Sequence, residues 1–98
     1  MTAYRVSKAA ADDIEAIVEY TIAVFGKVQA IAYHASIERT FQVLAEFPRI
    51  GRPTYDLKEG LYRFPHKAHM IFYTCAADHI FIARVLPARA DFKRVFLT

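Results

Sequence analysis

The sequence predicts an α+β domain in which an antiparallel two-helix hairpin packs on an antiparallel β-sheet. Apolar residues recur at steps of three and four through the first half of the chain, which is the period of amphipathic helices. Short segments rich in aromatic and β-branched residues follow, separated by proline, glycine and polar turns, as is typical of strands. The chain has 98 residues, so we expect one domain over residues 1–98.

The first helix is expected to begin after Ser7 and to end at Gly26, behind a short extended segment at residues 4–6. A serine hydroxyl can accept a hydrogen bond from a free N–H group of the first turn, and the nearby Asp12 and Asp13 favour the start of a helix. Glycine readily takes the backbone conformation that ends a helix. The predicted apolar stripe comprises Ala10, Ile14, Ile17, Val18, Thr21 and Phe25.

The second helix is expected over residues 27–47, because Pro48 cannot continue it. Two helices joined near one glycine form an antiparallel hairpin. The second half of the chain is too apolar to remain uncovered, so a sheet is expected to pack on the hairpin. The predicted stripe comprises Ala30, Tyr33, Ile37, Thr40, Phe41, Leu44 and Phe47, with Ser36 facing elsewhere.

Three strands are expected after a loop over residues 48–59: residues 61–64, ended by Pro65, then residues 68–75 and 79–86. Residues 91–96 are expected to form a helical turn or a tail. In the last two strands both alternating sets of side chains are largely apolar, so both faces of the sheet should be covered. The hairpin can cover one face, and we take the other as a sign of a protein partner.

Composition limits the class of protein. The formal net charge is +3, but residues 1–47 carry −2 and residues 48–98 carry +5, which indicates either an acidic partner for the second half or a solvated face. The one cysteine, Cys75, excludes a disulfide within the chain and is interpreted as a small core residue in a reducing, cytoplasmic protein. The sequence has no signal-peptide pattern and no apolar run long enough to span a membrane.

Motifs for chemistry are sparse. The chain has no phosphate-binding glycine motif and no serine-hydrolase motif, so no cofactor is expected. His66 and His69 flank a strand start, where a three-residue step points side chains to opposite faces, so no metal site is expected.

The most informative side chains are Arg63 and Arg84, each within an otherwise apolar strand, together with basic residues near the C-terminus. A buried guanidinium without a partner is costly. Two interpretations stay open: a cationic site for phosphate or a partner's carboxylate, or pairing with Asp78, Asp91 or Glu59.

The chain resembles the ParE toxins of the RelE/ParE superfamily of type II toxin–antitoxin systems. The resemblance spans nearly the whole chain and lies in the order and spacing of four segments rather than in any single motif. They are Tyr4-Arg5-Val6-Ser7 with Ala10, Asp13, Ile14 and Ile17; Pro48 with Gly51-Arg52-Pro53; Gly60-Leu61-Tyr62-Arg63-Phe64 with Met70-Ile71-Phe72-Tyr73; and Ile80-Phe81-Ile82-Ala83-Arg84-Val85-Leu86 with Asp91.

The resemblance implies that the first strand lies at the edge of the sheet and that a ParD-like antitoxin wraps the toxin. It also implies DNA gyrase as the target of the ParE branch, whereas the RelE branch cleaves mRNA on the ribosome. A histidine often follows the last-strand Arg-Val-Leu of relatives, but Pro87 stands here, and no tyrosine follows Tyr73. Because proline cannot transfer a proton, the sequence favours the branch that inhibits by binding.

These expectations assign three sets of residues. Antitoxin contact is expected in the groove between the hairpin and the sheet, anchored by Arg63, Tyr73 and Arg84. Target contact is expected along the last strand and the basic tail, at Arg84, Arg89, Phe92, Lys93 and Arg94. If the chain is instead a ribosome-dependent nuclease, the catalytic candidates are Arg63, Arg84, His66 and Lys67. A third possibility is a retained fold without toxicity.

Overall fold

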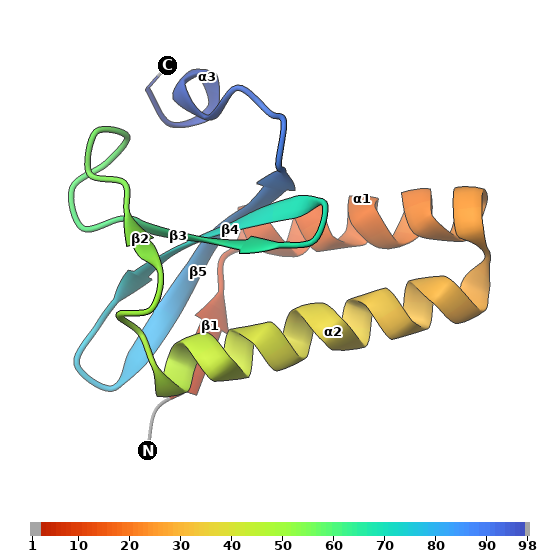
Figure 1. The fold of residues 1–98 in the computed structure, drawn as a ribbon, viewed down its shortest axis with the longest axis horizontal. Coiled ribbons are helices and arrows are strands. Elements are labelled where there is room, and N and C mark those ends of the chain that lie inside the picture. Colours follow the sequence, from red (N-terminus) through yellow and green to blue (C-terminus); the bar gives the residue numbers. More distant parts are fainter. Residues whose placement is uncertain (1–2, 98) are drawn as a thin grey trace.

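The computed structural model describes residues 3–97; residues 1, 2 and 98 of the expected domain lie outside the described part. Strand β1 (Ala3–Val6) leads into a hairpin of α1 (Lys8–Phe25) and α2 (Lys27–Glu46). The remaining elements are β2 (Arg52–Pro53), β3 (Tyr62–His66), β4 (His69–Cys75), β5 (His79–Pro87) and α3 (Phe92–Leu97). The α+β fold class is therefore confirmed, with the hairpin on one side of the sheet and α3 on the other (Figure 1).

The sheet has five strands in the order β1-β5-β4-β3-β2. Strand β1 lies at the edge, as expected, and pairs in parallel with β5, while the other pairs are antiparallel. The sheet is therefore mixed. A register shift between Phe72 and Tyr73 places these residues opposite Arg84 and Ile82, so Ala83 forms a bulge in β5.

The predicted start of α1 is confirmed in detail. The Ser7 hydroxyl accepts a hydrogen bond from the Ala10 amide at 2.9 Å and donates one to the Ala83 carbonyl at 2.8 Å. One side chain thus caps the helix and ties it to β5. Gly26 joins the two helices with a φ of 91°, a conformation that favours glycine.

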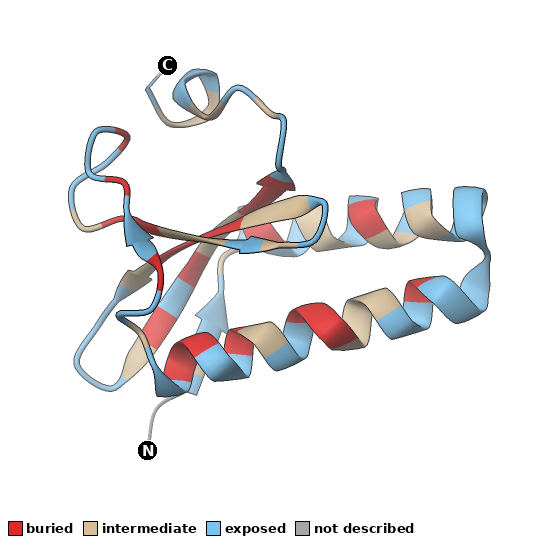
Figure 2. Cartoon of the chain, viewed as in Figure 1, coloured by how far each residue is buried: buried red, intermediate tan, exposed pale blue. Residues whose placement is uncertain are grey.

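The side of the sheet that faces the hairpin holds the larger core. Phe41 and Leu44 from α2 meet Ile71 and Ile82 from the sheet, and all four side chains are buried. The predicted helix stripes are right at their centres and wrong at their ends, because Phe25 and Phe47 are exposed. Ser36, predicted to face outward, is buried. The outer end of the hairpin is coloured almost entirely as exposed in Figure 2.

A second core corrects the inference that a partner covers the other face of the sheet. Phe72 is buried there beneath α3, with the rings of Phe92 and Phe96 at 4.9 and 4.8 Å from its own. The chain therefore covers this part of the sheet itself. The cluster comprises Leu57, Leu61, Phe72 and Leu86, with Met70, Ala83, Ala90, Phe92, Val95 and Phe96 packed against it.

Two further expectations are corrected. Strand β3 continues through Pro65, which is exposed, and ends at His66. Cys75 is exposed at the end of β4 rather than in the core, because it pairs with β5 alone: the pairing with β3 ends at Tyr73. Burial still raises the pKa of its thiol, so it is not an activated nucleophile.

Within residues 3–97, no helix combines the length and the apolar character needed to cross a membrane.

Candidate partner-binding site

A groove of about 760 Å³ lies between β1 and the two helices of the hairpin. We call it the hairpin groove. The buried Phe41 and Ile37 line it, as does Tyr4, whose ring packs against Phe41 with 5.3 Å between the ring centroids. The two helices extend beyond the sheet at the end where α1 meets α2 (Figure 1), and the groove lining there includes Ile22 and Lys27. Its lining comprises Tyr4, Val6, Ala11, Ile14, Glu15, Val18, Glu19, Ile22, Lys27, Ala30, Ile31, His34, Ile37, Glu38 and Phe41.

The hairpin groove continues into exposed apolar side chains at the outer end of the hairpin. Ile31 lines the groove and is 62% exposed, while Val28, one turn earlier on α2, is 82% exposed and lies outside the lining. Apolar side chains gathered in this way mark an interaction surface rather than a solvated face. The exposed set comprises Tyr20, Ile22, Val24, Phe25, Val28 and Ile31.

Charged groups also line the hairpin groove. Glu15 and Glu19 come from α1 and Glu38 comes from α2, against the single lysine Lys27. His34 lies with Nδ1 3.6 Å from the Glu38 carboxylate. The groove therefore combines an apolar floor with a mainly acidic border.

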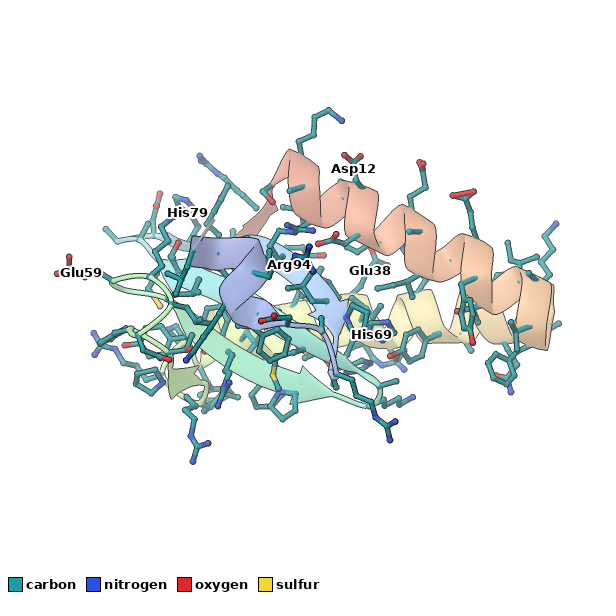
Figure 3. All side chains as sticks on the ribbon, turned by 90° about the horizontal axis from the view of Figure 1, so that it is seen from above. Asp12, Glu38, Glu59, His69, His79 and Arg94 are labelled. Atoms are coloured by element: carbon teal, nitrogen blue, oxygen red, sulfur yellow. The ribbon has the colours of Figure 1, made fainter. Side chains whose placement is uncertain are left out.

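Arg84 has a partner that the sequence did not reveal. Its Nε and Nη2 atoms donate to the two carboxylate oxygens of Asp13, each at 2.8 Å. The Val85 amide donates to the same carboxylate at 2.9 Å. The expected partners were Asp78, Asp91 and Glu59, but Glu59 lies on a loop at the end of the molecule opposite the hairpin tip (Figure 3).

The ion pair with Asp13 stabilises the charged form of the Arg84 guanidinium. The hydrogen bonds and charge of Asp13 raise the pKa of the guanidinium further above its usual range. The two side chains are 30% and 13% exposed, so the pair is partly shielded from water. Arg84 is thus held in place between β5 and α1, with part of its surface still open.

Arg63 lies on the α3 side of the sheet. Its Cα partners are Arg52 on β2 and Phe72 on β4, and Tyr62 and Phe64 on either side of it pack toward the hairpin core. Arg63 and Arg52 both line a second groove of about 510 Å³, beside α3. The structure thus joins Arg63 with Arg52, a residue for which the sequence suggested no role.

Tyr73 is placed in the core. Its side chain has no exposed area, its hydroxyl donates to the Pro48 carbonyl at 2.8 Å, and it accepts from the Gly51 amide at 3.0 Å. Burial raises the pKa of this hydroxyl to about 12. In this conformation Tyr73 offers no surface to an antitoxin, and its contacts fix the corner between α2 and β2.

His66, one of the nuclease candidates, and His69 lie across the β3–β4 turn from each other. His66 and His69 are Cα partners, so they share one face of the sheet, which corrects the expectation of opposite faces. His66 Nε2 lies 2.9 Å from the Ser36 hydroxyl and its Nδ1 lies 3.0 Å from the Thr40 hydroxyl. His69 Nδ1 lies 2.7 Å from the Tyr33 hydroxyl, between β4 and α2 (Figure 3).

These contacts limit the chemistry available. His66 faces α2, whereas Arg63 faces α3, so the four nuclease candidates are not gathered at one site. The ammonium group of Lys67 lies 5.5 Å from the ring of Tyr33, on the same side as His66. In the described part of the chain, no group of three or more histidine, cysteine or acidic side chains is placed to hold a metal ion.

The expected target-binding residues lie in and before α3. Phe92 is half-buried against Phe72, while Arg89 and Lys93 are exposed. The Arg94 amide donates to the Asp91 carboxylate at 3.2 Å, at the start of the helix. The aromatic side chains of α3 therefore hold it on the sheet, and basic side chains face outward.

Comparison with known proteins identifies the class. A family model described as "ParE toxin of type II toxin-antitoxin system, parDE" matches residues 4–92. Toxin ParE1 of Caulobacter vibrioides is 33% identical over 86 residues, which cover 88% of each chain. Toxin ParE3 of the same organism is 36% identical over 55 residues, covering 56% of this chain and 55% of that relative.

The fold has a solved counterpart in the chromosomal ParDE toxin–antitoxin system from P. aeruginosa. The two chains superpose with a TM-score of 0.76 at 17% identity, over 89% of this chain and 96% of the other. Fold and sequence thus define a toxin of a type II toxin–antitoxin system. The chain belongs to the ParE toxin family, as the resemblance implied.

Sequence reasoning missed two features of the candidate site. The role of Asp13 was hidden because its partner is 71 residues away and the acidic start of α1 already had a local explanation. The apolar wall at Ile22, Val28 and Ile31 did leave a signal, because these residues lie outside the predicted stripes. Apolar residues on both sides of an amphipathic helix indicate a second contact surface.

Proposed function

We propose that this toxin is neutralised by a ParD-like antitoxin, a segment of which occupies the hairpin groove. The observation that carries the proposal is the groove itself, an apolar depression that continues into exposed side chains at the hairpin end. Burying such surface is favourable by about 25 cal/mol per Å². An amphipathic segment with an apolar face is the partner that suits this lining, and basic side chains on its flanks would meet Glu15, Glu19 and Glu38.

For the target, we propose DNA gyrase, inhibited by binding rather than by covalent chemistry of the toxin. Membership of the ParE family supports this branch of the superfamily. A nuclease would need a proton-transfer group beside a cation that contacts phosphate. The separation of Arg63 from His66 and the pairing of Arg84 with Asp13 both weigh against that alternative. A gyrase inhibitor acts in the cytoplasm.

Two matched substitutions on α2 test the groove. Ile31→Asp places a charge in the lining, whereas Gln29→Asp places the same charge at an exposed polar position of the same helix, outside the lining and the apolar set. Losing the burial of one isoleucine costs about 1.5–3 kcal/mol, so Ile31→Asp should weaken antitoxin binding by roughly tenfold or more. With the antitoxin co-expressed, cells carrying Ile31→Asp should stop growing and cells carrying Gln29→Asp should grow. Equal neutralisation of both variants would contradict the assignment of the groove.

The target is tested by inducing the toxin in cells without antitoxin and following DNA and protein synthesis separately. Gyrase inhibition predicts that DNA synthesis stops first and that chromosomal breaks accumulate while translation continues. Early loss of translation with cleaved mRNA, abolished by Arg84→Ala, would instead support the nuclease. Growth without any effect would indicate a retained fold that only binds an antitoxin.

A further inference from the structure

Arg52 on the edge strand β2 and Arg63 on its neighbour β3 are directly opposite each other. Residues directly opposite on an antiparallel pair have their Cβ atoms within about 5.5 Å, and like charges in this position destabilise the sheet. Within residues 3–97, neither guanidinium has an ion pair or a side-chain hydrogen bond. An anion placed between them would replace this repulsion with two charge-assisted hydrogen bonds.

The two arginines lie in the 510 Å³ groove beside α3, which we call the arginine groove. Its other walls are apolar and include Ile50, Met70 and Phe92. A ligand that fits must therefore present negative charge next to apolar groups. Extended peptides do this when carboxylate side chains alternate with aliphatic ones.

The aromatic walls favour a peptide over nucleic acid. Proteins that bind single strands offer open aromatic faces on which bases stack. Here the ring of Phe92 packs edge-on against Phe72 at 4.9 Å, and Phe64 packs against the hairpin-side core. Pro65, also in the wall, has no N–H group to donate to an added strand, so side chains must carry the recognition.

We propose that the arginine groove binds an acidic, extended segment of a protein partner. Its carboxylates bridge Arg52 and Arg63, and a neighbouring apolar side chain packs on Met70 and Phe92. The arginine groove lies on the α3 side of the sheet and the hairpin groove on the other side, so both can be filled at once. The proposal does not depend on gyrase being the target.

The test uses the full chain labelled with ¹⁵N and two blocked tetrapeptides. One has the order glutamate, leucine, aspartate, leucine, so that acidic and aliphatic side chains alternate, and the other has glutamine and asparagine in place of the two acids. Titration of the acidic peptide should shift the Nε–H resonances of both Arg52 and Arg63 and should saturate. The amide peptide should leave them unmoved at the same concentrations.

Variants locate the site. Because a hydrogen bond to a charged group contributes about 1.5–3 kcal/mol, Arg52→Gln and Arg63→Gln should each weaken the acidic peptide about tenfold or more. Arg49→Gln changes an exposed arginine of the same loop that does not line the groove, and affinity should stay within about twofold. Arg52 is exposed, so its substitution should leave the thermal unfolding midpoint unchanged.

Four results would overturn the proposal: no saturable shift at millimolar acidic peptide, an equal shift with the amide peptide, equal loss in Arg49→Gln, or tighter binding of a thymidine oligonucleotide than of the acidic peptide. The last result would assign the groove to nucleic-acid phosphates instead.

Discussion

Asp13 completes the edge of β5 at the point where β1 ends. The parallel pairing stops at Val6 and Ile82, and the chain turns into α1 through Ser7. The next outward amide of β5, at Val85, would face no strand, and the Asp13 carboxylate accepts its hydrogen bond instead. A side chain from the second turn of a helix thus takes the place of a strand carbonyl.

We expect Asp13→Ala to lower the free energy of unfolding by about 2–3 kcal/mol, because it leaves Arg84 and the Val85 amide without their acceptor. Asp13→Asn keeps one acceptor oxygen and should cost about half as much. Urea unfolding followed by circular dichroism measures both. The neighbouring Asp12 pairs only with exposed Lys8, so Asp12→Ala should cost less than about 0.5 kcal/mol. A loss in Asp12→Ala equal to that in Asp13→Ala would contradict this account.

At the scale of elements, the β3–β4 turn is fastened to α2 by two histidines. His66 is held by Ser36 and Thr40, and His69 is held by Tyr33. Burial lowers the pKa of both imidazoles below the usual 6.5, and for His66 the charges of Lys67, His69 and Arg39 act in the same direction. The folded protein therefore favours two neutral rings packed against α2.

The contacts of His66 and His69 with α2 predict that the free energy of unfolding falls at low pH. Because the folded pKa of each histidine is lower than the unfolded one, the unfolded chain binds more protons below about pH 6.5, and the free energy of unfolding decreases as the pH is lowered from about 7 to 5. The double variant His66→Gln with His69→Gln should flatten this dependence. Gln42→Ala changes an exposed side chain of α2 that carries no titrating group and should leave the dependence unchanged. Stability that rises toward pH 5 would mean that the surrounding hydroxyls hold a charged His66.

Helix α3 covers one face of the sheet and also carries residues that we expect to contact the target, so an experiment must separate these two roles. Deleting the chain from residue 88 onward would expose Phe72 and Leu86, because α3 covers them. Loss of toxicity would then report unfolding as much as loss of target contact. The exposed basic side chains can be changed without disturbing the aromatic contacts.

We therefore predict that Arg89→Gln combined with Lys93→Gln abolishes growth inhibition while the thermal unfolding midpoint stays within about 2 °C of the parent. The physical reason is that both side chains are exposed and contribute charge to the target contact rather than packing. Lys58→Gln removes an exposed positive charge from another loop and should remain toxic. Full toxicity of the double variant would remove the tail from the target surface.

For the whole molecule, the sequence predicted the fold class and the edge position of the first strand well. Helix periods, the Ser7 cap and the Pro48 stop are local signals, and the resemblance supplied the edge position of the first strand. Local signals did not predict that α3 covers the second face of the sheet. Helix α3 is only six residues long, and its contact with Phe72 joins parts of the chain that are distant in sequence.

The candidate site was less predictable than the fold. Family resemblance directed attention to Arg63, Tyr73 and Arg84, but their surroundings depend on long-range contacts: a core corner for Tyr73, Asp13 for Arg84 and Arg52 for Arg63. Sequence patterns report which side chains are unusual in a strand. They do not report which face or which partner each one meets.

The uneven distribution of charge and apolar surface over the molecule leads to the central claim. An acidic-bordered groove on the hairpin and basic side chains around α3 lie on opposite sides of one sheet, which suits a protein that binds an antitoxin on one side and a target on the other.

The most direct test is a supercoiling and cleavage assay with purified DNA gyrase, relaxed plasmid and the folded toxin. We predict loss of supercoiling together with linear plasmid trapped on the enzyme, and no effect from the variant that combines Arg89→Gln with Lys93→Gln. Full supercoiling in the presence of excess folded toxin would contradict the account.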